Sequence, residues 1–260
     1  MNEQALKSSM RVLVTGAGSG IGAGIAEQLA GQGHQLIVTD LRLEASEQIA
    51  ERIVDAGGSA EALALDVSSD ESIQTLVDGL ESPVDVLVNN AGLQHVAPLD
   101  EFPMEKWNLL IQVMLVGVAK VSQALLPGMR AQGFGRIVNI GSIHSLVASP
   151  YKSAYVAAKH GLMGFSKVVA LETADTDITI NTICPTYVKT PLVDKQIADQ
   201  ARNHGISEDE VVANIMLKPM PKGEFISLEE LAGITAFLMS PVARNITGQA
   251  IVVDGGWTVQ

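Results

Sequence analysis

Short apolar runs alternate with helix-length segments along almost the whole chain, and this alternation constrains the fold most. The runs lie at 12–15, 36–40, 62–65, 84–88, 136–140, 178–183 and 250–253. Continuously apolar strands separated by helices are typical of a parallel sheet that is covered on both faces. Because crossovers between parallel strands are right-handed, the sequence predicts an α/β fold with a doubly wound, Rossmann-type sheet of seven parallel strands.

The segments between the runs predict the helices and the domain organisation. Apolar or helix-forming patterns predict helices at 21–32, 43–56, 107–129, 153–173 and 228–239. The chain contains no linker, repeat or low-complexity stretch, so we expect one domain over 1–260. Segment 189–224 departs from the alternation and contains three prolines, Pro191, Pro219 and Pro221. Long insertions at strand ends often carry substrate lids, so we expect 189–224 to be a mobile lid.

Charge and cysteine content exclude several classes of function. The chain has 17 basic and 29 acidic side chains, for a net charge of −12. Such a surface repels phosphate groups, so we expect neither nucleic acid nor membrane as a partner. A single cysteine, Cys184, excludes an intramolecular disulfide and a multi-cysteine metal site, and no other residues indicate a metal site. With no leader pattern and no apolar run of about 18 residues, we expect a cytoplasmic protein.

A glycine-rich string joins the first expected strand to the first expected helix. Its glycines allow a tight turn and a close approach to a pyrophosphate, and the helix after it offers free N–H groups. Glycine turns alone are common, but the strand before and the helix after this one favour dinucleotide binding over a structural turn. The expected cofactor contacts in the string are Thr15, Gly16, Ser19, Gly20, Ile21 and Gly22.

Asp40 ends the second expected strand and bears on the choice of cofactor. A carboxylate there can accept hydrogen bonds from both adenine-ribose hydroxyls and repels a 2′-phosphate, so the sequence predicts NAD rather than NADP. The alternative is a solvated acid, with Arg42 able to serve a phosphate. Further cofactor contacts are expected at Asp66, Val67, Asn90, Ala91, Gly92, Pro185, Val188 and Thr190.

Tyr155 and Lys159 share one face of an expected helix because they are four residues apart. A tyrosine with a pKa of about 10 is a poor base at neutral pH, but a neighbouring ammonium stabilises its phenolate and lowers that pKa. The pair could then remove a proton from an alcohol while hydride leaves the carbon. Such a pair alone is commonly just a helix surface; Ser142, after the fifth strand, adds a hydrogen-bonding group for the substrate oxygen.

Taken together, these motifs resemble the short-chain dehydrogenase/reductase family. The motifs are Thr15-Gly16-x-x-x-Gly20-Ile21-Gly22, Asn89-Asn90-Ala91-Gly92, Ser142, Tyr155-x-x-x-Lys159 and Asp254-Gly255-Gly256. Segments 93–95, 134–140, 142–149, 152–161 and 190–193 are similar to the branch of bacterial D-3-hydroxybutyrate dehydrogenases. The resemblance implies reversible oxidation of D-3-hydroxybutyrate to acetoacetate with NAD, by a homotetramer.

The resemblance also implies a set of substrate-binding residues. Gln94, His144, Lys152 and Gln196 would hold the substrate carboxylate, with Tyr187 and Trp257 in the same pocket. Tyr155 and Lys159 would contact the cofactor as well. From the residues alone, His144 could instead be a loop histidine with satisfied hydrogen bonds, Lys152 a solvated surface lysine, and Trp257 a subunit-interface residue.

Three positions depart from the family pattern. Met114 stands where the family has a catalytic asparagine, Tyr187 where it usually has tryptophan, and Thr186 where a glycine follows the proline. The resemblance implies that the asparagine widens its helix and holds a water that links Lys159 to solvent. A thioether has no N–H and is a weak acceptor, so we expect a different relay or slower turnover. The alternatives are an enzyme for another 3-hydroxy or 3-oxo acid or acyl thioester, and a non-catalytic NAD-binding scaffold.

Overall fold

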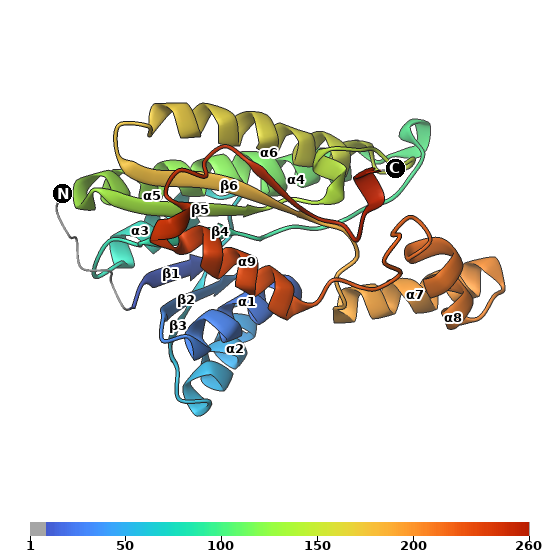
Figure 1. Ribbon diagram of the computed structural model, residues 1–260, viewed down its shortest axis with the longest axis horizontal. Helices are drawn as coiled ribbons and strands as arrows, with labels where there is room; N and C mark the ends of the chain where they lie inside the picture. The colour runs from blue at the N-terminus through green and yellow to red at the C-terminus, as the bar shows by residue number, and fades with distance from the viewer. Residues whose placement is uncertain (1–8, 260) are drawn as a thin grey trace.

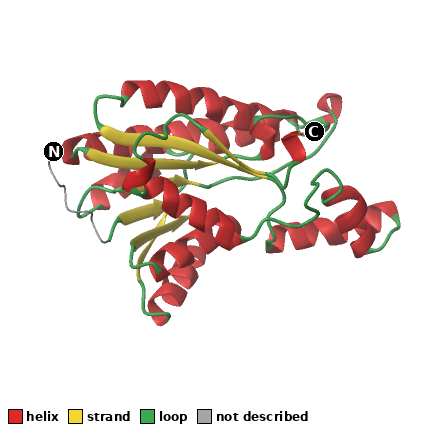
Figure 2. Ribbon diagram, in the orientation of Figure 1, coloured by secondary structure: helices red, strands yellow, loops and turns green. Residues whose placement is uncertain are grey.

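Seven parallel strands form one sheet in the computed structural model, which describes residues 9–259 (Figures 1 and 2). The order across the sheet is β3-β2-β1-β4-β5-β6-β7. The strands are β1 (Arg11–Val14), β2 (Gln35–Asp40), β3 (Ser59–Ala64), β4 (Val86–Asn89), β5 (Phe134–Ile140), β6 (Asp177–Pro185) and β7 (Ala250–Val253). The predicted doubly wound sheet is confirmed, and its order reverses between β1 and β4, where α/β proteins bind ligands.

The central strands are apolar throughout because both of their faces are buried. Val12 and Val14 pack into a cluster with residues of helices α1 (Gly20–Gly31), α2 (Leu43–Asp55) and α9 (Leu228–Met239). Leu13, between them, packs into the opposite cluster, with α3 (Asp70–Gly79), α5 (Gly117–Gln132) and α6 (Ser153–Glu172). The period-two alternation of a strand therefore supplies two cores from one apolar run.

Outside the expected lid, the helices differ from the predicted ones in two places. Helix α3 was not predicted, because only Ile73 and Leu76 of its residues are buried and its apolar pattern is short. The helix expected at 107–129 runs over 104–132, as α4 (Met104–Ile111), a π-helical segment at Gln112–Val116, and α5. By length and composition Met104–Gln132 could cross a membrane, but a single such helix is weak evidence, and here α5 packs on β5 and α4 on α6.

The expected lid segment is largely helical. It contains α7 (Pro191–His204), α8 (Glu208–Val211) and a π-helical turn at Val212–Met216, which extend beyond the sheet on the right of Figure 1. Val193, Ile197, Val211 and Met216 form a small core of their own, against which Tyr187 packs. A segment with a separate core can move as a unit, but its mobility stays a prediction.

Candidate active site

The glycine string and the loop after β4 interlock at the switch point of the sheet. The Asn90 side-chain amide donates to the carbonyls of Thr15 (3.0 Å) and Gly16 (2.9 Å). The Thr15 hydroxyl accepts from the backbone N–H groups of Asn90 and Ala91, both at 3.0 Å. Gly16 has φ +61°, and a Cβ there would lie 2.7 Å from the Ala91 Cα. This packing requires glycine and brings together two segments predicted to bind the cofactor.

Asp40 is fixed beside the glycine string rather than freely solvated. Its carboxylate accepts hydrogen bonds from the backbone N–H groups of Gly18 (3.1 Å) and Arg42 (3.2 Å). Gly20, at the start of α1, has φ +60° and open space where a Cβ would stand. The residues present therefore fit a dinucleotide, with the open helix start for the pyrophosphate and the carboxylate for the ribose.

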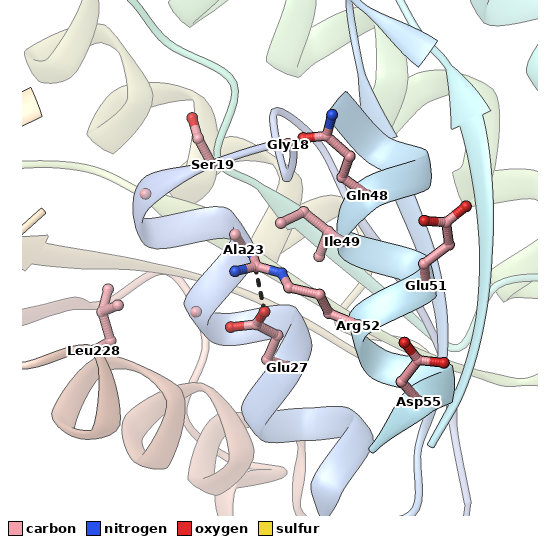
Figure 3. A pocket seen from close by; sticks show the side chains of 12 residues that line it. Gly18, Ser19, Ala23, Glu27, Gln48, Ile49, Glu51, Arg52, Asp55 and Leu228 are labelled. Carbon is pink, nitrogen blue, oxygen red and sulfur yellow. Dashed lines mark ion pairs between the residues drawn. The ribbon is translucent and has the colours of Figure 1, made fainter. Parts of the chain in front are cut away.

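A groove of about 600 Å³ begins at the same string (Figure 3). It lies between α1 and α2, with Leu228 of α9 at one side and the Glu27–Arg52 ion pair (3.0 Å) inside it. None of its lining residues is a predicted catalytic or substrate-binding residue.

The structure brings Ser142, Tyr155 and Lys159 together. Ser142 follows β5 and caps a short 3-10 helix at Ile143–Ser145, where its hydroxyl accepts from the His144 N–H at 3.2 Å. Tyr155 and Lys159 come from the first two turns of α6, and Ser142 hydrogen-bonds Tyr155. The Lys159 ammonium donates to the Ile140 carbonyl at 2.7 Å and lies 5.6 Å from the centre of the Tyr155 ring. A hydroxyl, a phenol and a cation thus meet at one end of β5.

Burial dominates the electrostatics of these groups. It lowers the pKa of Lys159 to about 8, so the ammonium is still mostly charged at pH 7. Burial also raises the pKa of Tyr155, and the hydrogen bond with Ser142 only opposes that change. The direction at Tyr155 differs from the lowering expected of a lysine neighbour, because loss of hydration outweighs the other effects in this enclosed site.

Met114 lies in the π-helical segment and is buried. It packs with Leu110 and with Ala154 and Ala158 of α6, and Tyr155 contacts the same cluster. The widened helix turn that the resemblance attributes to an asparagine is therefore present with methionine in its place. Such π-bulges occur often at functional sites.

We expect Met114→Asn to retain or raise kcat, most clearly below neutral pH, where proton exchange at Tyr155 and Lys159 would limit turnover. An amide placed in this apolar cluster should also lower stability by about 1–3 kcal/mol unless it finds a partner. Both effects can be measured as pH–rate profiles and thermal unfolding, with Met114→Leu as an apolar control. A large loss of kcat in a folded Met114→Asn variant would show that Met114 belongs to a differently built pocket.

His144 and Lys152 form a close pair next to these groups. His144 Nε2 lies 3.3 Å from Lys152 Nζ and 3.3 Å from the Ser149 hydroxyl. Burial, and then the charge of Lys152, lowers the pKa of His144 to about 4, so the ring is neutral at physiological pH. Burial lowers the pKa of Lys152 too. The pair is a partly dehydrated cation with a neutral imidazole, a combination suited to a small anion.

Aromatic rings continue the wall of this region. The His144 ring meets Tyr155 and Trp257 edge-on, with ring centres 6.1 Å and 6.3 Å apart. Tyr187 stacks on Trp257 at 6.4 Å. Gln94 is exposed on the loop after β4 and Gln196 lies half-buried on α7, so their part in binding a carboxylate rests on the resemblance alone.

A buried polar row that the sequence analysis missed supports the strand ends. Asn89, Asn139 and Thr182 stand in register on β4, β5 and β6. Asn89 donates to Asn139 (2.9 Å), Asn139 donates to Ser166 of α6 (3.0 Å), and Ser166 hydrogen-bonds Thr182 (3.1 Å). A polar residue near the end of each of three apolar strands was the available indication. The row fixes the strands that lead to Asn90 and Ser142 relative to the helix of Tyr155 and Lys159.

Cys184 is fully buried, and it lies beside Ser142 and Lys159. Its thiol donates to the Thr182 carbonyl at 3.7 Å, and the Ser145 side chain, the Ser142 backbone and the Lys159 charge are close enough to lower its pKa. Burial nevertheless raises the pKa of the thiol, which keeps it protonated. Cys184 is therefore a buried, protonated neighbour of the Ser142 loop.

Comparisons with known proteins match this geometry. Residues 16–258 match a family described as enoyl-(acyl carrier protein) reductase. The chain is 42% identical over 255 residues to the D-beta-hydroxybutyrate dehydrogenase of Rhizobium meliloti, covering 95% of this chain and 98% of that protein. It is 44% identical over 253 residues to the enzyme of the same name from Cupriavidus necator, covering 95% and 97%. A solved structure from Beutenbergia cavernae, described as an NAD(P)-dependent gluconate 5-dehydrogenase with NADP bound at low occupancy, superposes with a TM-score of 0.87 at 33% identity, covering 96% of this chain and 97% of that chain.

Proposed function

Because the chain belongs to the short-chain dehydrogenase/reductase family, we propose that it oxidises D-3-hydroxybutyrate to acetoacetate with NAD, reversibly. The observation that carries the proposal is the His144–Lys152 pair, whose Nε2 and Nζ atoms lie 3.3 Å apart, beside Tyr155. A small hydroxy acid offers little apolar surface, so its carboxylate must provide much of its orientation. A cation next to the catalytic phenol meets that need.

The mechanism follows from the positions of the side chains. Lys152 and His144 bind the carboxylate, and the Ser142 hydroxyl holds the reacting oxygen against Tyr155. Tyr155 accepts the alcohol proton as a general base, and the Lys159 charge stabilises the phenolate that results. NAD, when bound, supplies the hydride acceptor. Lys159 would also hold the nicotinamide ribose, and Tyr187 and Trp257 would enclose the substrate methyl group and exclude water.

The function is tested by following NADH absorbance with purified protein and D-3-hydroxybutyrate. The L enantiomer is the matched control, because it presents the same carboxylate with the hydroxyl and the hydrogen exchanged at C3. Turnover only of a longer 3-hydroxy acid or of a 3-oxoacyl thioester would keep the enzyme class and change the substrate. NAD binding with no turnover of any of these would leave a non-catalytic scaffold.

For the cofactor, we expect a higher kcat/KM with NAD than with NADP. The Asp40 carboxylate, held beside the glycine string, would lie against a 2′-phosphate, and like charges in contact cost several kcal/mol. Asp40→Ala should therefore narrow the preference by about tenfold or more. Asp175→Ala, which removes an exposed acid from the turn between α6 and β6, is the control and should leave the preference for NAD unchanged. Equal or better use of NADP by the unaltered protein would refute this prediction, and a similar solved structure does carry NADP.

We further propose that the protein is a cytoplasmic homotetramer. Large apolar side chains are exposed on α6 (Val168, Leu171) and around α9 and the C-terminal end (Phe237, Val242, Val259). Large apolar side chains left exposed to this extent favour a contact surface with another protein chain. A mass measured by light scattering during size-exclusion chromatography tests the proposal, and a monomer at micromolar concentration would contradict it.

A further inference from the structure

Tyr151, in the loop between β5 and α6, has a left-handed backbone conformation. Its φ is +69°, and it is the only non-glycine residue with positive φ within 9–259. The side chain is 58% exposed, so its packing does not account for the conformation. A residue of positive φ directly after a proline is the pattern of a type II turn, which favours glycine or asparagine at that position. A tyrosine there is strained, and such strain persists only where the surrounding structure imposes it.

The backbone around Tyr151 joins two loops of the candidate active site. The Tyr151 carbonyl accepts a hydrogen bond from the N–H of Ala97 at 3.0 Å. Ala97 belongs to the loop after β4, which also carries Gly92 and Gln94. The next residue, Lys152, is the N-cap of α6. Its carbonyl accepts a hydrogen bond from the Val156 N–H at 2.9 Å, and its Nζ lies 3.3 Å from His144 Nε2. The turn therefore lies where the 91–98 loop, the Lys152 side chain and the start of α6 meet.

We propose that Tyr151 is a positioning residue whose left-handed backbone aims Lys152 at His144 and holds the 91–98 loop against it. This inference rests on the proposed function, because it assigns the pair to a carboxylate. The backbone conformation performs the task and the phenol does not. A residue that resists positive φ shifts the turn, and the shift reaches Lys152 first because Lys152 is next in the chain.

The test compares two substitutions at one position. Tyr151→Gly accepts positive φ and should keep the KM for D-3-hydroxybutyrate. Tyr151→Val resists it, and a penalty comparable to the strain of a left-handed residue should raise that KM about fivefold or more, with little change in kcat. The KM for a neutral 2-alkanol should rise far less in Tyr151→Val. Leu146→Val is the control, because it introduces the same side chain into the same loop at a residue whose φ is −124°. It should leave the KM for both substrates unchanged.

A second readout does not need turnover. The Lys152 charge contributes to holding the pKa of His144 at about 4, with burial as the larger cause and the charge of His160 as a smaller one. When Lys152 moves away, that pKa rises. The pKa of the His144 ring, measured by NMR titration, should therefore be higher in Tyr151→Val and unchanged in Tyr151→Gly. Exchange of the Ala97 amide hydrogen should accelerate in Tyr151→Val alone.

The outcomes separate the inference from the proposed function. If the unaltered protein turns over no hydroxy acid but the His144 titration shifts as described, the positioning role stands and the proposed substrate fails. If Tyr151→Val leaves both the KM and the His144 titration unchanged, or if Tyr151→Gly is equally impaired, the inference is overturned. Should Tyr151→Val not fold, Ala97→Pro removes the other half of the hydrogen bond, and an unchanged KM there would also overturn it.

Discussion

Replacing Tyr155 with phenylalanine should lower kcat by about 10²–10⁴-fold, the usual contribution of general acid–base catalysis. The substitution removes the phenolic hydroxyl that hydrogen-bonds with Ser142. It keeps the aromatic ring that packs against His144 and the Met114 cluster. Cofactor binding and the melting temperature should change little. Steady-state kinetics, fluorescence titration with NADH and thermal unfolding measure the three effects.

The matched control is Tyr151→Phe, which removes the phenol of an exposed tyrosine only four residues away. It should leave kcat unchanged. The pH dependence gives a second check, because oxidation needs Tyr155 without its proton and burial raises the pKa of that group. The oxidation rate of the unaltered enzyme should therefore increase with pH through the neutral range, and reduction should show the opposite trend. Near-normal turnover by Tyr155→Phe would show that Tyr155 is not the general base.

The sheet could be predicted because each of its central strands is buried on both faces. A run such as Val12-Leu13-Val14 must be apolar at every position to serve two cores, so it stands out from the helices around it. Helix α3 could not be found in this way, since its exposed residues are polar and only two of its side chains, Ile73 and Leu76, are buried. The N-cap at Ser69, whose hydroxyl accepts from Ser72 at 3.2 Å, was the local indication that was overlooked.

The gathering of Ser142, Tyr155 and Lys159 could also be anticipated, because the ends of parallel strands and the helices that follow them meet at one edge of the sheet. The unusual backbone conformations near the site could not be anticipated from the sequence. The positive φ of Tyr151 contradicts the preference of its residue type, and the π-helical turn around Met114 has no asparagine to indicate it. Tyr151 bonds the loop of Ala97 and Met114 packs on α6, and both contacts join segments far apart in the sequence, which can override local propensity.

Removing the charge of Lys152 should separate acidic from neutral substrates. A hydrogen bond to a charged group contributes about 1.5–3 kcal/mol, so Lys152→Ala should lower kcat/KM for D-3-hydroxybutyrate by about ten- to a hundredfold. Lys152 is half-buried, and this partial loss of hydration lowers the pKa of its ammonium, so a bound carboxylate would restore part of the lost stabilisation of the charge. Neutral 2-alkanols of matched length should be poor substrates for the unaltered enzyme and should lose little in Lys152→Ala.

Lys167→Ala is the control, since it removes an exposed lysine from the same helix as Tyr155 and Lys159. The experiment is a double comparison of acid against neutral alcohol, with and without Lys152. If Lys152→Ala lowers kcat/KM equally for both substrates, Lys152 has a structural role. A group that binds only the carboxylate cannot affect the binding of an alcohol that lacks one. If neutral alcohols match the acid before any substitution, binding energy from the carboxylate does not select the substrate, and the hydroxybutyrate proposal fails together with the role of Lys152.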